Sequence, residues 1–320
     1  MSRVRVAIIQ GEILPDWEGC LDRTRALARE AAAGGAHCVV FPETWLPGYP
    51  AWFDVCRDIG LWDHAPTKAL HARYAAASID VHGDSGAALA ELARSLGVTL
   101  VIGVSEQVAS GPGRGTLFNS LLTFGPDGAL LNHHRKLMPT HTERLVWGAG
   151  DADGVRAVAT PVGRVGGLIC WEHWMPLARQ ALHDSGEDLH VAAWPGAHER
   201  NQVASRQYAF EGRCYVLVAA SVMRGRSLPD GFEVDPTRVP LPEGWIVRGG
   251  SAIIGPDGQY VVEPVFDRPA ILHAELDLSR IREESMALDV TGHYARPDCF
   301  TLHVHRRGRL APGDRTPSCP

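Results

Sequence analysis

Short apolar runs alternate with longer segments of helical spacing along most of the chain. Apolar runs bounded by glycine, proline or polar clusters predict strands, and apolar residues three or four positions apart predict helices. Strands are expected at 4–10, 37–41, 99–105, 117–124, 129–133, 165–169, 190–194, 215–221, 251–254 and 260–262. Helices are expected at 17–33, 66–77, 85–96, 174–183, 202–211 and 278–286. Strands interspersed with helices in this way predict an α/β domain.

The tetrapeptide Gly-Pro-Asp-Gly occurs twice, at 125–128 and at 255–258, each time between two apolar runs. Glycine and Pro-Asp are typical of tight turns, so each segment predicts a β-hairpin inside a mixed sheet. The proline- and charge-rich stretch 226–248 is expected to be a long surface excursion. We expect one domain over 1–305 and a disordered tail at 306–320.

Composition places the chain among globular proteins that bury a large core. Its 320 residues are 45% hydrophobic, the net charge is −6 and the basic residues are scattered. No basic block or aromatic–basic stripe favours binding to nucleic acid. No charged-then-apolar leader occurs at 1–11, and no apolar run is long enough to cross a bilayer. We therefore expect a cytoplasmic protein without nucleic-acid or membrane partners.

Cysteine and histidine usage argues against a disulfide framework and against a metal site. The seven cysteines are far apart, odd in number and without a CxxC pair, as expected for reduced thiols. The fifteen histidines include no HExxH motif, and His133–His134 lacks carboxylate or cysteine partners at ligand spacing. The glycine-rich segment 148–154 does not match a dinucleotide-binding loop. No metal or cofactor is expected.

Three chemically distinct side chains follow predicted strands in the same sense. Glu43, Lys136 and Cys170 each come just after an apolar run. Taken singly, each has an ordinary explanation, as a loop acid, a surface lysine and a small buried thiol. If the strands are neighbours in one sheet, however, an acid, a cation and a thiol converge at one edge of that sheet.

Such a constellation suits attack on a carbon–nitrogen multiple bond or on an amide. A thiol must lose its proton to be a good nucleophile, and a carboxylate at hydrogen-bond distance can accept that proton. An ammonium and a backbone N–H can stabilise the negative charge that develops on nitrogen or oxygen. The carboxylate can then return its proton to the departing ammonia and activate water.

Longer segments carry a family resemblance from about Val4 to about Asp298, in the correct order. FPETWLPGYPAW (41–52), HRKLMPTHTERLVWGAGD (134–151) and GGLICWEHWMPL (166–177) resemble the three signature regions of the nitrilase superfamily, and of its nitrilase branch in particular. Later segments agree, namely YAFEGRCYVLVAAS (208–221), GGSAIIGPDG (249–258) and GHYARPD (292–298). The resemblance implies a four-layer α-β-β-α sandwich with mixed sheets, paired across subunits as a homodimer or higher homo-oligomer.

The same resemblance implies a role for each candidate residue. Cys170 would be the nucleophile, Glu43 the general base and acid, and Lys136 the group that stabilises the tetrahedral intermediate. Glu143 matches the second glutamate of the family, which positions the lysine or the substrate. The backbone N–H of Trp171 would complete an oxyanion hole. Residues implied to line the substrate pocket are Tyr49, Trp147, Trp194 and His198.

By resemblance, the expected reaction is hydrolysis of a nitrile to a carboxylic acid and ammonia, through a thioimidate and a thioester on Cys170. Hydrolysis of a small amide at the same site is the nearest alternative, and conversion of cyanide is a narrower one. A catalytically silent binding protein need not keep Glu43, Lys136 and Cys170 together. A zinc hydrolase is the least favoured alternative. An aromatic pocket would suit aryl or arylaliphatic nitriles.

Overall fold

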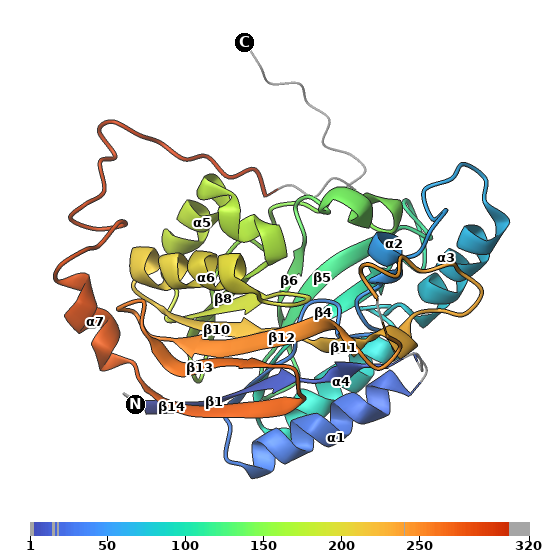
Figure 1. The fold of residues 1–320 in the computed structure, drawn as a ribbon. Coiled ribbons are helices and arrows are strands. Elements are labelled where there is room, and N and C mark those ends of the chain that lie inside the picture. The colour runs from blue at the N-terminus through green and yellow to red at the C-terminus, as the bar shows by residue number, and fades with distance from the viewer. Residues whose placement is uncertain (1–2, 15–16, 18, 240, 307–320) are drawn as a thin grey trace.

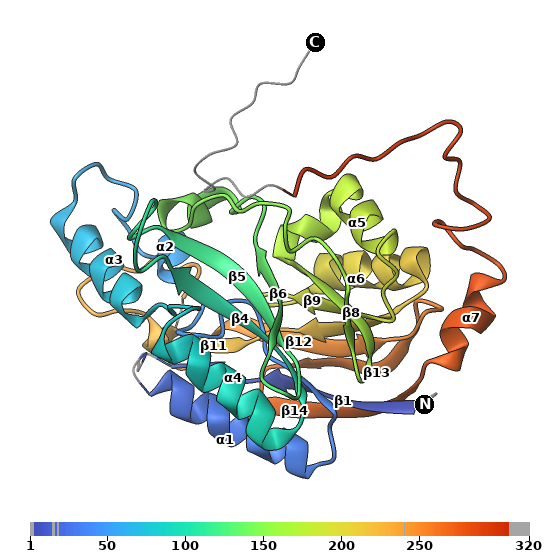
Figure 2. The same ribbon diagram turned by 180° about the vertical axis from the view of Figure 1, so that it is seen from behind.

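Two β-sheets packed face to face form the centre of the molecule, and helices cover both outer faces (Figures 1 and 2). The computed structural model describes residues 3–14, 17, 19–239 and 241–306. Both sheets combine parallel and antiparallel strands. The predicted four-layer α-β-β-α sandwich with mixed sheets is therefore confirmed.

The first sheet contains six strands: β1 (Arg3–Gln10), β3 (Cys38–Val40), β4 (Thr99–Gln107), β5 (Leu117–Phe124), β6 (Leu130–Arg135) and β14 (Ala270–Asp277). Their order across the sheet is β14-β1-β3-β4-β5-β6. β1, β3 and β4 run parallel to one another, whereas β14, β5 and β6 pair antiparallel with their neighbours. As a result β3 and β6 point the same way without being adjacent.

The second sheet contains β2 (Glu12–Ile13), β7 (Val158–Thr160), β8 (Gly163–Ile169), β9 (Leu189–Ala193), β10 (Tyr215–Ala219), β11 (Val222–Arg224), β12 (Trp245–Ile254) and β13 (Tyr260–Phe266). The order is β2-β11-β12-β10-β9-β8-β7, and β13 pairs with β12. The central strands β8, β9 and β10 are parallel. β9 and β10 are buried along their whole length and β8 from Val165 onward, and these buried parts read as nearly continuous apolar runs in the sequence.

The helices lie mainly on the outer faces of the two sheets. In Figure 1, α1 (Cys20–Ala33) and α4 (Asp84–Leu96) lie below the first sheet. α5 (Pro176–His183) and α6 (Glu199–Gly212) lie above the second. Shorter helices are α2 (Trp52–Val55), α3 (Ala65–Ala77) and α7 (Ser279–Ser285), with 3₁₀ helices η1 (His141–Leu145), η2 (Cys170–Trp174) and η3 (Gly225–Ser227).

The alternation of side chains along β1 explains why the first sheet is buried on both faces. Val6 belongs to the apolar cluster that contains Leu217 of the second sheet. Ile9, three residues further along the strand and therefore on its opposite face, belongs to the cluster that contains Leu89 of α4. Because successive side chains of a strand point to opposite faces, one apolar strand contributes to two cores.

Most predicted elements are present, and the differences have local causes. The first helix begins at Cys20 instead of at residue 17, and Trp17 packs edge-on against Tyr74 instead. The helix predicted over 174–183 begins at Pro176, because the residue before a proline favours extended backbone and Met175 adopts it. The tail predicted at 306–320 lies outside the described residues except for its first residue.

The stretch 226–248 is not a surface excursion throughout, and this prediction was wrong at its end. Strand β12 already begins at Trp245, where it pairs with β11. Strands β2, β7, β11 and β14 were also missed. β14 (AILHAELD) pairs with β1 along its whole length, but its outward-facing polar residues conceal the apolar alternation.

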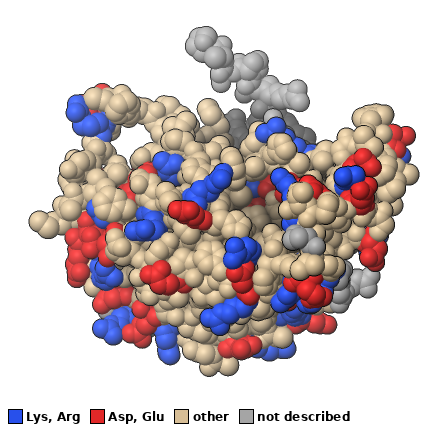
Figure 3. All heavy atoms as spheres, in the orientation of Figure 1, with Lys and Arg blue, Asp and Glu red and all other residues tan. Residues whose placement is uncertain are grey.

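Charged side chains of both signs intermingle on the face shown in Figure 3, without an extended basic surface there. Within the part of the chain that the structure describes, no helix is long and apolar enough to span a membrane.

Candidate active site

Glu43 is placed by a tight turn at the end of β3. Thr44, the next residue, has a positive φ of 42°. The turn lies so close to β4 that a Cβ on Gly103 would lie 2.2 Å from the Pro42 carbonyl oxygen. Only glycine fits at this point of the neighbouring strand. The turn directs the Glu43 carboxylate into the interior, where it is fully buried.

Lys136 directly follows β6, and its side chain is buried between two carboxylates. Its Nζ donates to Glu43 Oε1 at 2.9 Å and to Glu143 Oε2 at 2.7 Å. The Lys136 side chain is completely buried in both ion pairs. An ammonium held in this way is fixed in position, because both partners are themselves immobilised inside the protein.

Besides Lys136, two further donors hold Glu143 and one holds Glu43. Thr140 N donates to Glu143 Oε2 at 2.8 Å and the Tyr49 hydroxyl donates to Glu143 Oε1 at 3.2 Å. Asn119 Nδ2 donates to Glu43 Oε1 at 2.7 Å. The other oxygen of Glu43, Oε2, has no protein hydrogen-bond partner. That oxygen therefore keeps a free lone pair for an incoming proton.

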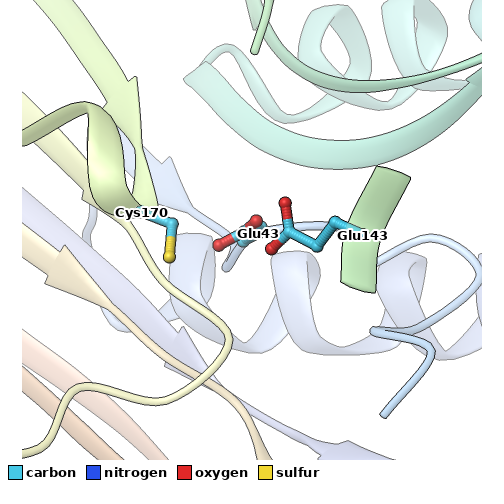
Figure 4. Close-up of side chains that lie close together, drawn as sticks. All are labelled: Glu43, Glu143 and Cys170. Atoms are coloured by element: carbon cyan, nitrogen blue, oxygen red, sulfur yellow. The ribbon is translucent and has the colours of Figure 1, made fainter. Parts of the chain in front are cut away.

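Cys170 reaches the same cluster from the opposite sheet. It follows β8 as the first residue of η2 and has a positive φ of 54°, which is uncommon for a residue other than glycine. Its Sγ and one carboxylate oxygen each of Glu43 and Glu143 lie within 4.8 Å of one another. Figure 4 shows the Cys170 side chain lying beside the carboxylates of Glu43 and Glu143.

The three strand ends do converge, but not at one sheet edge as the sequence suggested. Glu43 and Lys136 follow strands of the first sheet, whereas Cys170 follows a strand of the second. The site therefore lies where the two sheets meet. The acid and the cation are presented by one layer of the sandwich and the thiol by the other.

Burial and mutual charge set the protonation of the cluster. Burial raises the pKa of Glu43 to about 7, although the Lys136 ammonium lowers it. Burial lowers the pKa of Lys136, but Glu43, Cys170 and Glu143 outweigh this and raise it above its ordinary value. Burial raises the pKa of the Cys170 thiol well above its ordinary value, with Lys136 opposing. The resting thiol is therefore protonated.

Glu43, Glu143 and Cys170 are also the kinds of ligand that hold metal ions, and they lie close enough to do so. The Lys136 ammonium, however, already bonds both carboxylates. The donor set is thus neutralised by a cation that belongs to the protein, which makes it a poor fit for a resident metal.

A cavity of about 560 Å³ opens from Cys170 to the surface. Tyr49, Trp171 and His198, which the resemblance placed at the pocket, lie along its wall. Trp147 and Trp194 are instead buried in the core, and neither is among the described residues that line this cavity. Polar residues of the wall that sequence reasoning missed are Asp54, Thr140, His141, Thr142, Arg200 and Asn201.

Sequence reasoning also missed a buried carboxylate that ties the two sheets together. Glu172 accepts hydrogen bonds from the backbone N–H groups of Leu137 and Ile169, both at 2.7 Å, and its Oε2 lies 2.8 Å from His134 Nε2. It thereby links the chain leaving β6 to the last residue of β8.

The sequence did offer a signal for Asn119, because this polar residue interrupts the apolar run LFNSLLTF.

Solved structures share this fold. A carbon–nitrogen hydrolase from Helicobacter pylori G27 superposes with a TM-score of 0.70 at 20% identity, covering 93% of this chain and 96% of that chain. Saccharomyces cerevisiae Nit3, a member of branch 10 of the nitrilase superfamily, superposes with a TM-score of 0.69 at 20% identity, covering 92% and 97%. At this level of identity, the likeness supports the fold alone.

Sequence relatives are considerably closer. A protein named aliphatic nitrilase from Sinorhizobium fredii is 39% identical over 314 residues, which cover 97% of this chain and 98% of the relative. A bifunctional nitrilase/nitrile hydratase from Lupinus angustifolius is 37% identical over 309 residues, which cover 94% and 86%. The profile described as carbon–nitrogen hydrolase matches residues 5–284. The resemblance read from the motifs is confirmed, and the chain belongs to the carbon–nitrogen hydrolase family.

Proposed function

We propose that the chain is a nitrilase, which converts an organic nitrile and two water molecules to a carboxylic acid and ammonia. The observation that carries the proposal is the buried Lys136, bonded to Glu43 and Glu143 beside the Cys170 thiol at the inner end of an open cavity. Relatives named nitrilase at 35–39% identity over most of the chain support this reaction over other carbon–nitrogen hydrolyses.

The first half of the reaction makes a covalent thioimidate. Glu43 accepts the Cys170 proton while the sulfur attacks the nitrile carbon, and the proton passes to the nitrile nitrogen. The Lys136 ammonium and the backbone N–H of Trp171 stabilise the charge that develops there. The resulting R–C(=NH)–S–Cys170 keeps the acyl carbon next to the two carboxylates.

The second half consumes both water molecules. Glu43 activates the first water for addition to the thioimidate carbon and returns a proton to nitrogen, so that ammonia leaves and a thioester remains. A second water, activated in the same way, hydrolyses the thioester to the acid and restores the thiol. Glu143 holds Lys136 in place during both additions.

Activity is expected to fall as the pH drops below about 7, the value to which burial raises the pKa of Glu43. Only the ionised Glu43 carboxylate accepts a proton. Well below the pKa of Glu43, kcat/KM is therefore expected to fall about tenfold for each pH unit. Glu43→Gln is expected to lower kcat by about 10²- to 10⁴-fold and to remove this acidic limb. Glu91→Gln, at an exposed site on α4, is the matched control. An unchanged pH profile in Glu43→Gln would contradict the role of base.

The proposed reaction is tested by ammonia release from a panel of aliphatic, aryl and arylaliphatic nitriles, the matching amides and cyanide. The panel includes short nitriles with polar groups, because the cavity wall carries Asp54, His141 and Arg200. Ammonia from nitriles with the acid as product is expected. Ammonia from amides alone would indicate an amidase, and formamide or formate from cyanide would indicate a cyanide-converting enzyme.

We also propose that the protein acts in the cytoplasm as a homodimer or higher homo-oligomer and that 1–305 form a single domain. Apolar side chains exposed on α5 and α6, namely Leu177, Val203 and Phe210, support association. Light scattering coupled to size-exclusion chromatography checks the oligomeric state. A monomer at micromolar concentration would contradict it.

A further inference from the structure

A line of buried polar side chains runs from the backbone of Cys170 into the core below α5 and α6. The Cys170 carbonyl oxygen lies 2.7 Å from His173 Nδ1, and His173 Nε2 lies 3.0 Å from His190 Nε2. His190 Nδ1 lies 2.7 Å from Glu187 Oε1, and the Tyr208 hydroxyl donates to Glu187 Oε2. We call His173, His190, Glu187 and Tyr208 the histidine array.

The histidine array hydrogen-bonds the carbonyl of the Cys170–Trp171 peptide group, and the N–H on the opposite edge of this peptide lies at the site. The Cys170 carbonyl and the Trp171 N–H are parts of the same trans peptide, so they point in opposite directions. Because His173 fixes the direction of the Cys170 carbonyl, it also fixes the direction of the Trp171 N–H, which points toward the Cys170 sulfur. Burial raises the pKa of the Cys170 thiol, and Lys136 and this N–H are among the groups that oppose the rise.

We propose that His173, backed by the rest of the array, is a positioning residue that orients the Trp171 N–H as an oxyanion donor. The inference rests on the proposed function only in that a Cys170-dependent reaction must develop negative charge at this point. No histidine of the array touches the substrate cavity, so each acts through the peptide of Cys170.

The direction of the hydrogen bond between the two histidines follows from the bond to the Cys170 carbonyl, and burial then places the last proton. The carbonyl of Cys170 only accepts, so His173 carries its proton on Nδ1 and its Nε2 accepts from His190 Nε2–H. The remaining nitrogen of His190, Nδ1, then accepts, and Glu187 must supply the proton between them. Burial raises the pKa of Glu187 to about 7, and burial lowers that of His190 well below its ordinary value. The shared proton therefore belongs on Glu187.

The array is locked by its packing. His173 stacks on Trp194 at 4.7 Å between ring centroids, and His190 stacks on Tyr208 at 3.6 Å. Burial, followed by the neighbouring His190, lowers the pKa of His173 to about 3, so the ring is neutral and has one N–H to give. That single N–H is committed to the Cys170 carbonyl.

The test compares His173→Leu with His173→Asn on a substrate whose turnover Cys170→Ala abolishes. Asparagine places an amide N–H where Nδ1 of histidine lies, whereas leucine has no donor. His173→Leu is expected to lower kcat by about 100-fold, the usual cost of a lost oxyanion donor, and His173→Asn by less than about tenfold. KM is expected to change by less than about threefold in both, because the ground-state contacts remain.

Alkylation of Cys170 by iodoacetamide separates positioning from general damage. This displacement develops no oxyanion, so His173→Leu is expected to slow it only through the weaker ionisation of the thiol, by less than about tenfold, while turnover falls about 100-fold. Wild-type kcat in His173→Leu, or equal losses in His173→Leu and His173→Asn, would overturn the inference. So would a parallel loss of alkylation and turnover, which would assign His173 to the fold. A wild-type enzyme without nitrile turnover would overturn the proposed function alone, and the comparison would then use its amide substrate.

Discussion

Cys170→Ala is expected to lower nitrile turnover by at least about 10⁴-fold, because no other group can form the covalent intermediate. The variant should still fold. The side chain is small, and losing one sulfur atom costs about 1 kcal/mol in transfer free energy. The residual rate is measured as ammonia release at saturating nitrile, and folding by the midpoint of denaturant unfolding.

The matched control is Cys299→Ala, at an exposed thiol far along the chain from the site. This variant is expected to retain wild-type turnover. Intact-mass analysis adds an independent measurement, since a slowly hydrolysed nitrile should add its mass to the wild type and to Cys299→Ala but not to Cys170→Ala. Turnover in Cys170→Ala within tenfold of the wild type would exclude the covalent mechanism.

The position of Glu43, Lys136 and Cys170 after apolar runs suggested from sequence that they converge if their strands are neighbours, and the family resemblance supported this expectation. The sheet that each strand joins could not be predicted. Spacing and turn residues report on neighbours along the chain, whereas the pairing of β8 with β9 in a second layer is a long-range choice. The same acid, cation and thiol therefore meet across two layers.

The supporting residues were harder to find than the reacting ones. Asn119, Glu172 and His190 are polar groups within mainly apolar stretches of sequence, and each is buried. Burying a polar group without a partner is costly, so each such residue implies a partner elsewhere in the chain. The sequence alone does not name that partner. Trp147 and Trp194, which the resemblance placed at the pocket, are buried in the core of this structure.

Lys136→Ala is expected to lose both activity and stability, and the loss of stability should depend on pH. Lys136 is the ammonium bonded to two buried carboxylates, and removing one partner of a buried ion pair costs about 3–5 kcal/mol. Turnover is expected to fall by at least about 10²-fold, because the developing negative charge loses its principal cation. Lys68→Ala, which breaks an exposed pair with Asp63, is the matched control and should change stability by less than about 1 kcal/mol.

The sign of the pH dependence follows from the two carboxylates left behind. Without the ammonium, burial and the neighbouring Glu143 charge raise the folded-state pKa of Glu43 further above the value of about 4.3 that an unfolded glutamate has. The folded variant then binds more protons than the unfolded chain, so its free energy of unfolding decreases as the pH rises through the folded-state pKa. Urea unfolding of wild type and Lys136→Ala at pH 5.5 and pH 8 should therefore give the larger difference at pH 8. An equal difference at both pH values would mean that the carboxylates do not depend on Lys136 for their charge.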